Sequence, residues 1–150
     1  MAAAAATLTG LIFVGVSINL AKILSMPSLP DRALESLILL LTILVVSALA
    51  LVPAQSPPVI GIEFLSIGFV TWAIILYLDI RIWHNTEKRF KRHSRQNILF
   101  SQLAILPYII AGIIILCQGY SGFYWLIPGI LISFIKSIID AWVLLVEIHR

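Results

Sequence analysis

Apolar residues fill five long stretches of the chain, and short polar or proline-rich segments separate them. A helix needs about 20 mostly apolar residues to cross the ~30 Å hydrocarbon core of a bilayer. Each stretch reaches that length, so the pattern predicts an all-α integral membrane protein built as a bundle of five transmembrane helices. The expected spans cover residues 5–24, 33–52, 59–80, 97–118 and 123–148.

Helix-breaking segments mark the ends of the expected spans. Prolines occur in the segment 25–32 after the first span and in 53–58 after the second, and a glycine-bounded turn, 119–122, follows the fourth. A proline removes a backbone donor and crowds the preceding turn, so helices usually end at such segments. The polar segment 81–96 is expected to form a loop after the third span. All five spans then belong to a single transmembrane domain over 1–150.

The overall composition supports a membrane protein and excludes a soluble core. Of the 150 residues, 61% are hydrophobic and 11% are charged, with a mean hydropathy of +1.06. Soluble domains carry about 25% charged residues. A cleaved signal peptide has a positively charged segment before its apolar stretch, and the first apolar stretch of this chain has none. We therefore expect that stretch to be a retained helix.

Basic residues occur on alternate loops, which predicts the orientation of the chain. Lys and Arg follow the first and third spans and end the chain, whereas the loops after the second and fourth spans hold none. Nine of the ten basic residues therefore lie on one side, and the tenth, Lys136, lies within the fifth span. Because cytoplasmic loops are enriched in Lys and Arg, we expect the N-terminus outside and the C-terminus in the cytoplasm of a multi-pass cell (inner) membrane protein.

The fifth span contains two charged residues one helical turn apart. Lys136 lies near its middle, and Asp140 follows four residues later, on the same helix face. A lone charge at the bilayer centre costs roughly 2.5–3.5 kcal/mol on insertion scales, and pairing lowers that cost. The pair either fixes how the span packs or forms the polar lining of a path for an ion or small solute. Removing Asp140 alone should then be worse than removing both residues.

Two features next to the pair favour close helix packing or an interrupted helix. Gly129, Ser133, Ser137 and Ala141 form a row of small residues on the fifth span, suited to a seam within the chain or between subunits. Pro107 lies near the middle of the fourth span and interrupts its backbone hydrogen bonding. We expect Pro107 at the depth of the charged pair, as in transporters whose sites lie beside interrupted helices.

Further polar residues gather in the cytoplasmic half of the expected bundle. Ser17 and Asn19 lie in the first span, and Glu35 opens the second, where it either joins the polar path or caps its own helix. Glu63 lies apart from them near the outer end of the third span. It faces either an outer vestibule or the lipid headgroups.

The segment between the third and fourth spans is strongly basic and predicts contact with anionic lipid headgroups. Each such charge near the surface contributes roughly 1 kcal/mol. Phe90 is the only aromatic residue in the basic run, so no stacking platform for nucleic acid is present. The residues expected to contact anionic lipid are Lys88, Arg89, Lys91, Arg92 and Arg95.

The remaining chemistry of the sequence is sparse. Cys117 is the single cysteine, and no His or Cys pair has metal-ligand spacing, so neither a metal nor another cofactor is expected. No nucleophile–base pair or phosphate loop indicates an enzyme. Two functions remain: a subunit of a homo-oligomeric channel or transporter for a small ion or solute, or a non-transporting scaffold or accessory subunit. Solvent access to Lys136 and Asp140 would distinguish them.

Overall fold

The computed structural model describes residues 1–25, 29–85 and 91–148, and these ranges are helical throughout apart from short turns, with no strand. The expected all-α class is therefore confirmed. Three helical stretches are long and apolar enough to cross a membrane, and the last of them contains two helices joined by a 3-10 turn. The elements are α1 (Ala2–Ile18), α2 (Leu20–Ser25), α3 (Leu29–Leu49), α4 (Pro57–Asn85), α5 (Lys91–Gln118), the 3-10 helix η2 (Gly119–Trp125) and α6 (Leu126–Ile148).

The helix boundaries differ from the expected spans in two places. The first expected span is broken at Asn19, whose side-chain amide donates to the carbonyl of Gly15 at 3.1 Å, so that α1 and the short α2 are separate. The expected loop 81–96 is largely helical, because α4 continues to Asn85 and α5 already begins at Lys91. Arg, Lys and Gln in that segment are good helix formers, and it holds neither proline nor glycine. Polar residues therefore extend α4 and α5 beyond the expected ends of the third and fourth spans.

Prolines begin two of the helices rather than only separating them. Pro30 is the second residue of α3, and Pro57 is the first residue of α4. The first turn of a helix has unpaired backbone N–H groups, so a residue without one is tolerated there. Both helices therefore start within the segments 25–32 and 53–58, which the sequence pattern predicted to separate helices.

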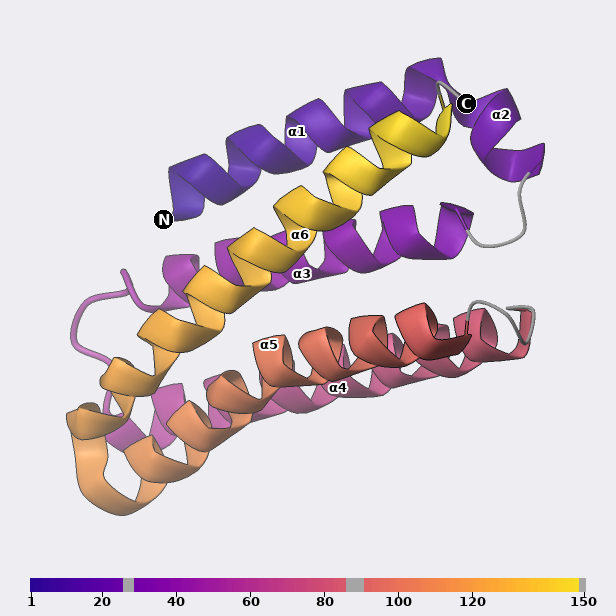
Figure 1. Cartoon of the computed structure of the whole chain (residues 1–150). Coiled ribbons are helices and arrows are strands. Elements are labelled where there is room, and N and C mark those ends of the chain that lie inside the picture. The colour runs from indigo at the N-terminus through magenta and orange to yellow at the C-terminus, as the bar shows by residue number, and fades with distance from the viewer. Residues whose placement is uncertain (26–28, 86–90, 149–150) are drawn as a thin grey trace.

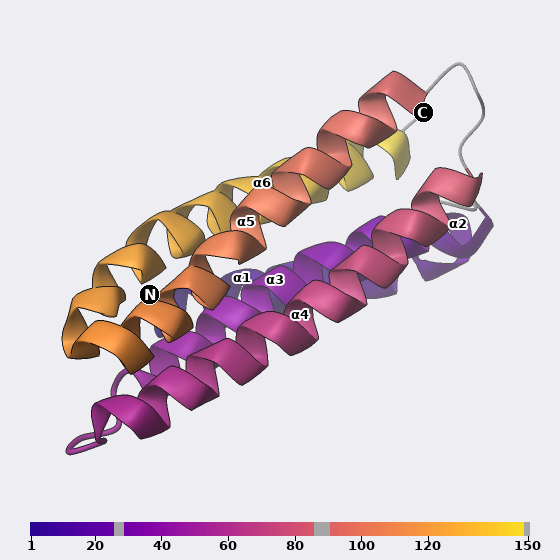
Figure 2. The ribbon, with the colours of Figure 1, turned by 90° about the horizontal axis from the view of Figure 1, so that it is seen from below.

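Helices α3, α4, α5 and α6 form a ring in which each contacts the next, and α1 packs on the outside against α3 (Figure 1). Successive long helices run in opposite directions. Both views place α2, the end of α4, the start of α5 and the C-terminus at one end of the bundle (Figures 1 and 2). The N-terminus, the α3–α4 connection and η2 lie at the other end.

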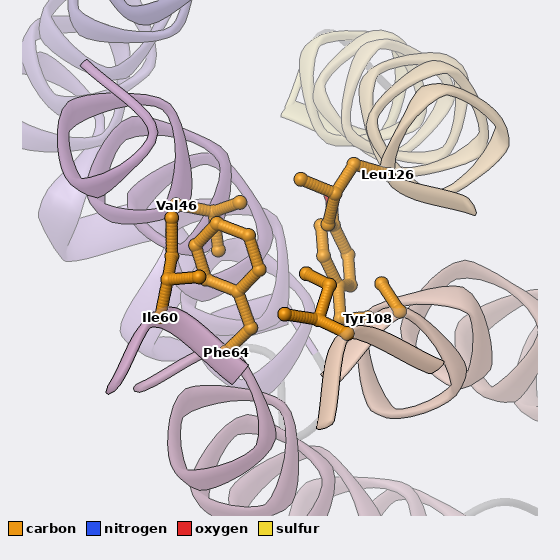
Figure 3. Packing of buried hydrophobic residues seen from close by; sticks show 7 residues of the cluster. Val46, Ile60, Phe64, Tyr108 and Leu126 are labelled. Carbon is orange, nitrogen blue, oxygen red and sulfur yellow. The ribbon is translucent and has the colours of Figure 1, made fainter. Parts of the chain in front are cut away.

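An apolar core fills the ring near the η2 end. Side chains from α3, α4, α5 and α6 meet there (Figure 3). The buried ring of Phe64 also packs edge-on against Phe123 of η2, with centroids 5.7 Å apart. Burial from four helices in one cluster holds this end of the bundle together. The labelled core residues are Val46, Ile60, Phe64, Tyr108 and Leu126.

Helices α4 and α5 make the most extensive contact in the bundle, and glycines allow their close approach. A Cβ atom on Gly112 of α5 would lie 2.8 Å from the backbone nitrogen of Leu65 on α4. On α4, a Cβ on Gly68 would lie 3.1 Å from the side chain of Ile109. Small residues of this kind let helix backbones pack closely in lipid. This second seam of small residues, unlike the row on α6, was not predicted from the sequence.

Candidate functional site

Lys136 on α6 lies between two buried carboxylates. It pairs with Asp140 one turn along α6, which confirms the interaction expected from their spacing. Its Nζ atom also lies 3.1 Å from Oε1 of Glu35 on α3, a contact that the sequence analysis did not foresee. The residue exposures are 3% for Lys136, 0% for Glu35 and 3% for Asp140. We call these three residues the charged cluster.

Helix α5 supplies hydrogen bonds to the charged cluster. The hydroxyl of Ser101 donates to Oε1 of Glu35, and the side-chain amide of Asn97 approaches Oε2 at 3.4 Å. Asn97 and Ser101 are four residues apart and so share one face of α5. Three helices of the ring therefore meet at Glu35. In the sequence, the four-residue spacing of Asn97 and Ser101 was the feature that could have indicated a polar face of α5 at this site.

A further buried carboxyl group, Asp79 on α4, lies in a separate hydrogen-bonded chain. The amide of Gln102 on α5 donates to Oδ2 of Asp79 at 3.2 Å and accepts from the indole of Trp72 at 2.8 Å. Asp79 is only 1% exposed, and its Oδ1 atom has no hydrogen-bond partner among the described residues. Arg81, its near neighbour in sequence, instead pairs with Asp31 at 3.3 Å. The sequence alone did not indicate that this carboxyl group is buried.

The expected row of small residues packs inside the chain. Ser133 accepts from the hydroxyl of Tyr108 at 3.2 Å and donates to the carbonyl of Ala104 at 3.3 Å. Ser137 donates to the carbonyl of Ser36 on α3 at 3.4 Å. The row thus joins α6 to α3 and α5, which is the internal seam rather than the one between subunits.

Three residues expected on the polar path lie away from the charged cluster. Pro107 is buried within a continuous α5 beside Gly129, which is about 10 Å along α6 from Lys136 at 1.5 Å per residue. Ser17 is exposed and donates to the carbonyl of Phe13, and Asn19 bonds Gly15 as described above. In the structure, both side chains therefore hydrogen-bond to backbone carbonyls of α1 instead of lining a path.

The remaining predicted residues lie elsewhere in the chain. Glu63, half-buried towards the η2 end, accepts from the amide of Gln55 at 3.0 Å. Arg95 is exposed near the start of α5. Lys91 and Arg92 lie in the first turn of α5, but their side chains are outside the described part of the structure. Lys88 and Arg89 lie outside the described residues.

A groove of about 260 Å³ between α5 and α6 reaches the charged cluster from the outside of the bundle. Lys136 and Asp140 form part of its wall, and Arg32 of α3 lies at its edge. Within the described ranges, no three His, Cys, Asp or Glu side chains are grouped to hold a metal ion. The polar residues lining the groove, which we call the α5–α6 groove, are Arg32, Gln96, Asn97, Lys136 and Asp140.

Comparison with protein-family models, curated proteins and solved structures gave no match to this chain. A proposal about function therefore starts from the chemistry of the buried polar groups. Two arrangements carry that chemistry: the charged cluster, in which one lysine holds two carboxylates, and the Asp79–Gln102–Trp72 chain beside it.

Proposed function

We propose that this protein is a non-enzymatic, multi-pass protein of the cell membrane and a subunit of a homo-oligomeric channel or transporter for a small cation, the proton included. Its five spans would be α1 with α2, α3, α4, α5 and α6. The N-terminus would lie outside and the C-terminus in the cytoplasm. The charged cluster and Asp79 would be the binding site on the path.

The proposed topology is supported by where the helix ends lie. The basic residues described at the ends of helices, such as Lys22, Arg81 and Arg95, are all on segments at the end of the bundle that holds the C-terminus. Helices that run alternately up and down would place that whole end on one side of a membrane. The positive-inside rule then assigns it to the cytoplasm.

The observation that carries the cation proposal is an excess of buried negative charge. Glu35, Asp79 and Asp140 are each at most 3% exposed, and Lys136 is the one buried cation among the described residues. Even with the half-buried Arg32 counted, three carboxylates face two cations. Burial of an uncompensated charge in an apolar medium is costly. A bound proton or cation would remove the imbalance, whereas purely structural pairing would need no third carboxyl group.

Access to the site is supported by the α5–α6 groove. Lys136 and Asp140 are nearly inaccessible as whole residues, yet both contribute atoms to the groove wall. A small rearrangement of α5 against α6 would therefore connect the charged cluster with the outside of the bundle. In an oligomer, the groove would face either lipid or a neighbouring subunit.

Flux measurements in liposomes test this proposal. The purified protein would be reconstituted with an internal pH dye, and proton, sodium and potassium gradients would be applied in separate experiments. We expect one of these gradients to dissipate faster than in empty liposomes, and Asp140→Asn to slow that flux at least ~10-fold. Asp31→Asn is the matched control, because Asp31 has its own partner in Arg81. Wild-type liposomes that leak none of the three ions would contradict the proposal.

The alternative is a scaffold or accessory subunit that transports nothing. It is favoured by the low solvent access of Lys136 and Asp140, each 3% exposed, and by their tight pairing, since Lys136 is held by carboxylates from both α3 and α6. Such an arrangement fixes helix positions and register without any ligand. Under this alternative, a triple variant with Glu35→Gln, Lys136→Met and Asp140→Asn would fold and keep its partners, and no ion flux would exist to lose.

A further inference from the structure

The α5–α6 groove changes from polar to apolar along its length. Gln96 and Asn97 lie near the start of α5, at the end of the bundle that holds the C-terminus, and Leu103 lies about 10 Å further along at 1.5 Å per residue. On α6, Asp140 lies nearer to that end than Ile132 and Ile135, and apolar Val143 lies one turn beyond Asp140. The apolar residues of the groove are Phe100, Leu103, Ile132, Ile135, Ile139 and Val143.

Arg32, at the polar end of the groove, is a cation with an unused hydrogen-bond donor. Nε of Arg32 is buried and has no hydrogen-bond partner among the described residues. Asp140 lies within electrostatic range of Arg32 but is already bound to Lys136. Lys136 is paired with both Glu35 and Asp140, so the guanidinium of Arg32 is the positive group of the groove wall that has a donor left for an anion. A planar guanidinium with a free donor is well suited to a phosphate.

The apolar part of the groove opens towards the outside of the bundle. Phe100 and Leu103 on α5 and Ile135 and Ile139 on α6 are each at least 50% exposed. This face would contact the hydrocarbon of the bilayer if the chain inserts as proposed. An occupant would therefore enter sideways from the bilayer, with its apolar part alongside these residues.

We infer that the α5–α6 groove binds one anionic phospholipid of the cytoplasmic leaflet. Its phosphate accepts from Arg32, and one acyl chain lies along the apolar residues between α5 and α6. The order of polarity fits a lipid of that leaflet, with its headgroup at the cytoplasmic end and its chain towards the bilayer centre. The inference rests on the proposed insertion and orientation but does not require transport.

Lipid retention in native mass spectrometry tests the headgroup contact. The protein would be titrated with phosphatidylglycerol or phosphatidylcholine of identical acyl chains. We expect phosphatidylglycerol to bind more tightly, and Arg32→Gln to weaken that binding about 10-fold, as for a charge-assisted hydrogen bond. Lys22→Gln is the matched control, because Lys22 is exposed at the same end of the bundle and does not line the groove. Equal binding of the two lipids, or equal loss in both variants, would overturn the inference.

A second pair of variants tests the acyl chain. Ile135→Trp would fill the apolar part of the groove, whereas Ile138→Trp places the same side chain at another exposed position of α6 outside it. We expect only Ile135→Trp to weaken phosphatidylglycerol binding. A competition with inorganic phosphate separates a lipid site from a free anion site. If phosphate displaces the lipid at comparable concentrations, or if both tryptophan variants bind normally, the groove is not a lipid site.

Discussion

Lys136 on α6 binds Glu35 on α3 across the bundle, Nζ to Oε1 at 3.1 Å, in addition to Asp140 on its own helix. The one buried lysine of the described residues is thus shared between two carboxylates. Each carboxylate depends on the same ammonium group, but the ammonium group depends on neither alone. This asymmetry determines how substitutions in the charged cluster should behave.

Lys136→Met is expected to be the most destabilising single change in the charged cluster. It leaves Glu35 and Asp140 buried near each other with no cation between them, and such a loss typically costs about 3–5 kcal/mol. Asp140→Asn should cost less, because Lys136 keeps its contact with Glu35. Thermal unfolding of the variants in one detergent would rank them. Equal losses from the two changes would show that Glu35 does not bind Lys136.

The three-residue charged cluster also changes which combination of substitutions should be tolerated. The sequence predicted that removing both Lys136 and Asp140 would be less harmful than removing Asp140 alone. With Glu35 as a further partner of Lys136, we now expect the opposite order, because the double variant leaves the carboxylate of Glu35 with only Ser101 and Asn97 as partners. Adding Glu35→Gln to Lys136→Met and Asp140→Asn should restore stability above that of the double variant. A triple variant no more stable than the double variant would contradict this account.

Gly112→Ala tests the close approach of α4 and α5. The new Cβ would lie 2.8 Å from the backbone nitrogen of Leu65, which cannot move aside as a flexible side chain would. We expect a loss of about 1–3 kcal/mol from overpacking. Gly15→Ala is the matched control, since nothing lies within 4 Å of a Cβ there. Chemical denaturation in mixed micelles would measure both, and a harmless Gly112→Ala would argue against the seam.

The sequence predicted the helical class because long apolar runs and their interruptions are local signals. It also predicted the contact between Lys136 and Asp140, since a spacing of four residues fixes a shared helix face. It could not predict Glu35 as a partner of Lys136, because that contact depends on how α3 and α6 pair in the ring. The same holds for Asp79, whose burial follows from the packing of α4 against α5.

Cysteine accessibility tests the proposed orientation. In a Cys117→Ser background, Ser121→Cys should react with an impermeant maleimide added to intact cells, because η2 would lie outside. Arg95→Cys should react only after the membrane is permeabilised, because it lies near the start of α5 at the opposite end of the bundle. Both positions are exposed, so burial would not hide either thiol. The reverse labelling pattern would invert the topology.

Asp79→Asn distinguishes a site for a cation from a structural polar group. The asparagine retains an oxygen that accepts from Gln102, so the bond at 3.2 Å to the amide can persist while the charge is removed. If Asp79 contributes uncompensated negative charge, the variant should be more stable than the wild type by about 1–3 kcal/mol in the absence of a bound cation. It should also lose most of the ion flux, which would be the trade-off expected of a residue kept for function.

Asp31→Asn should do the opposite, with reduced stability and normal flux, because it breaks the ion pair with Arg81. Thermal unfolding and liposome flux on the same preparations measure both properties. A destabilised Asp79→Asn would mean that its carboxylate is already compensated, and the argument from excess buried charge would fail.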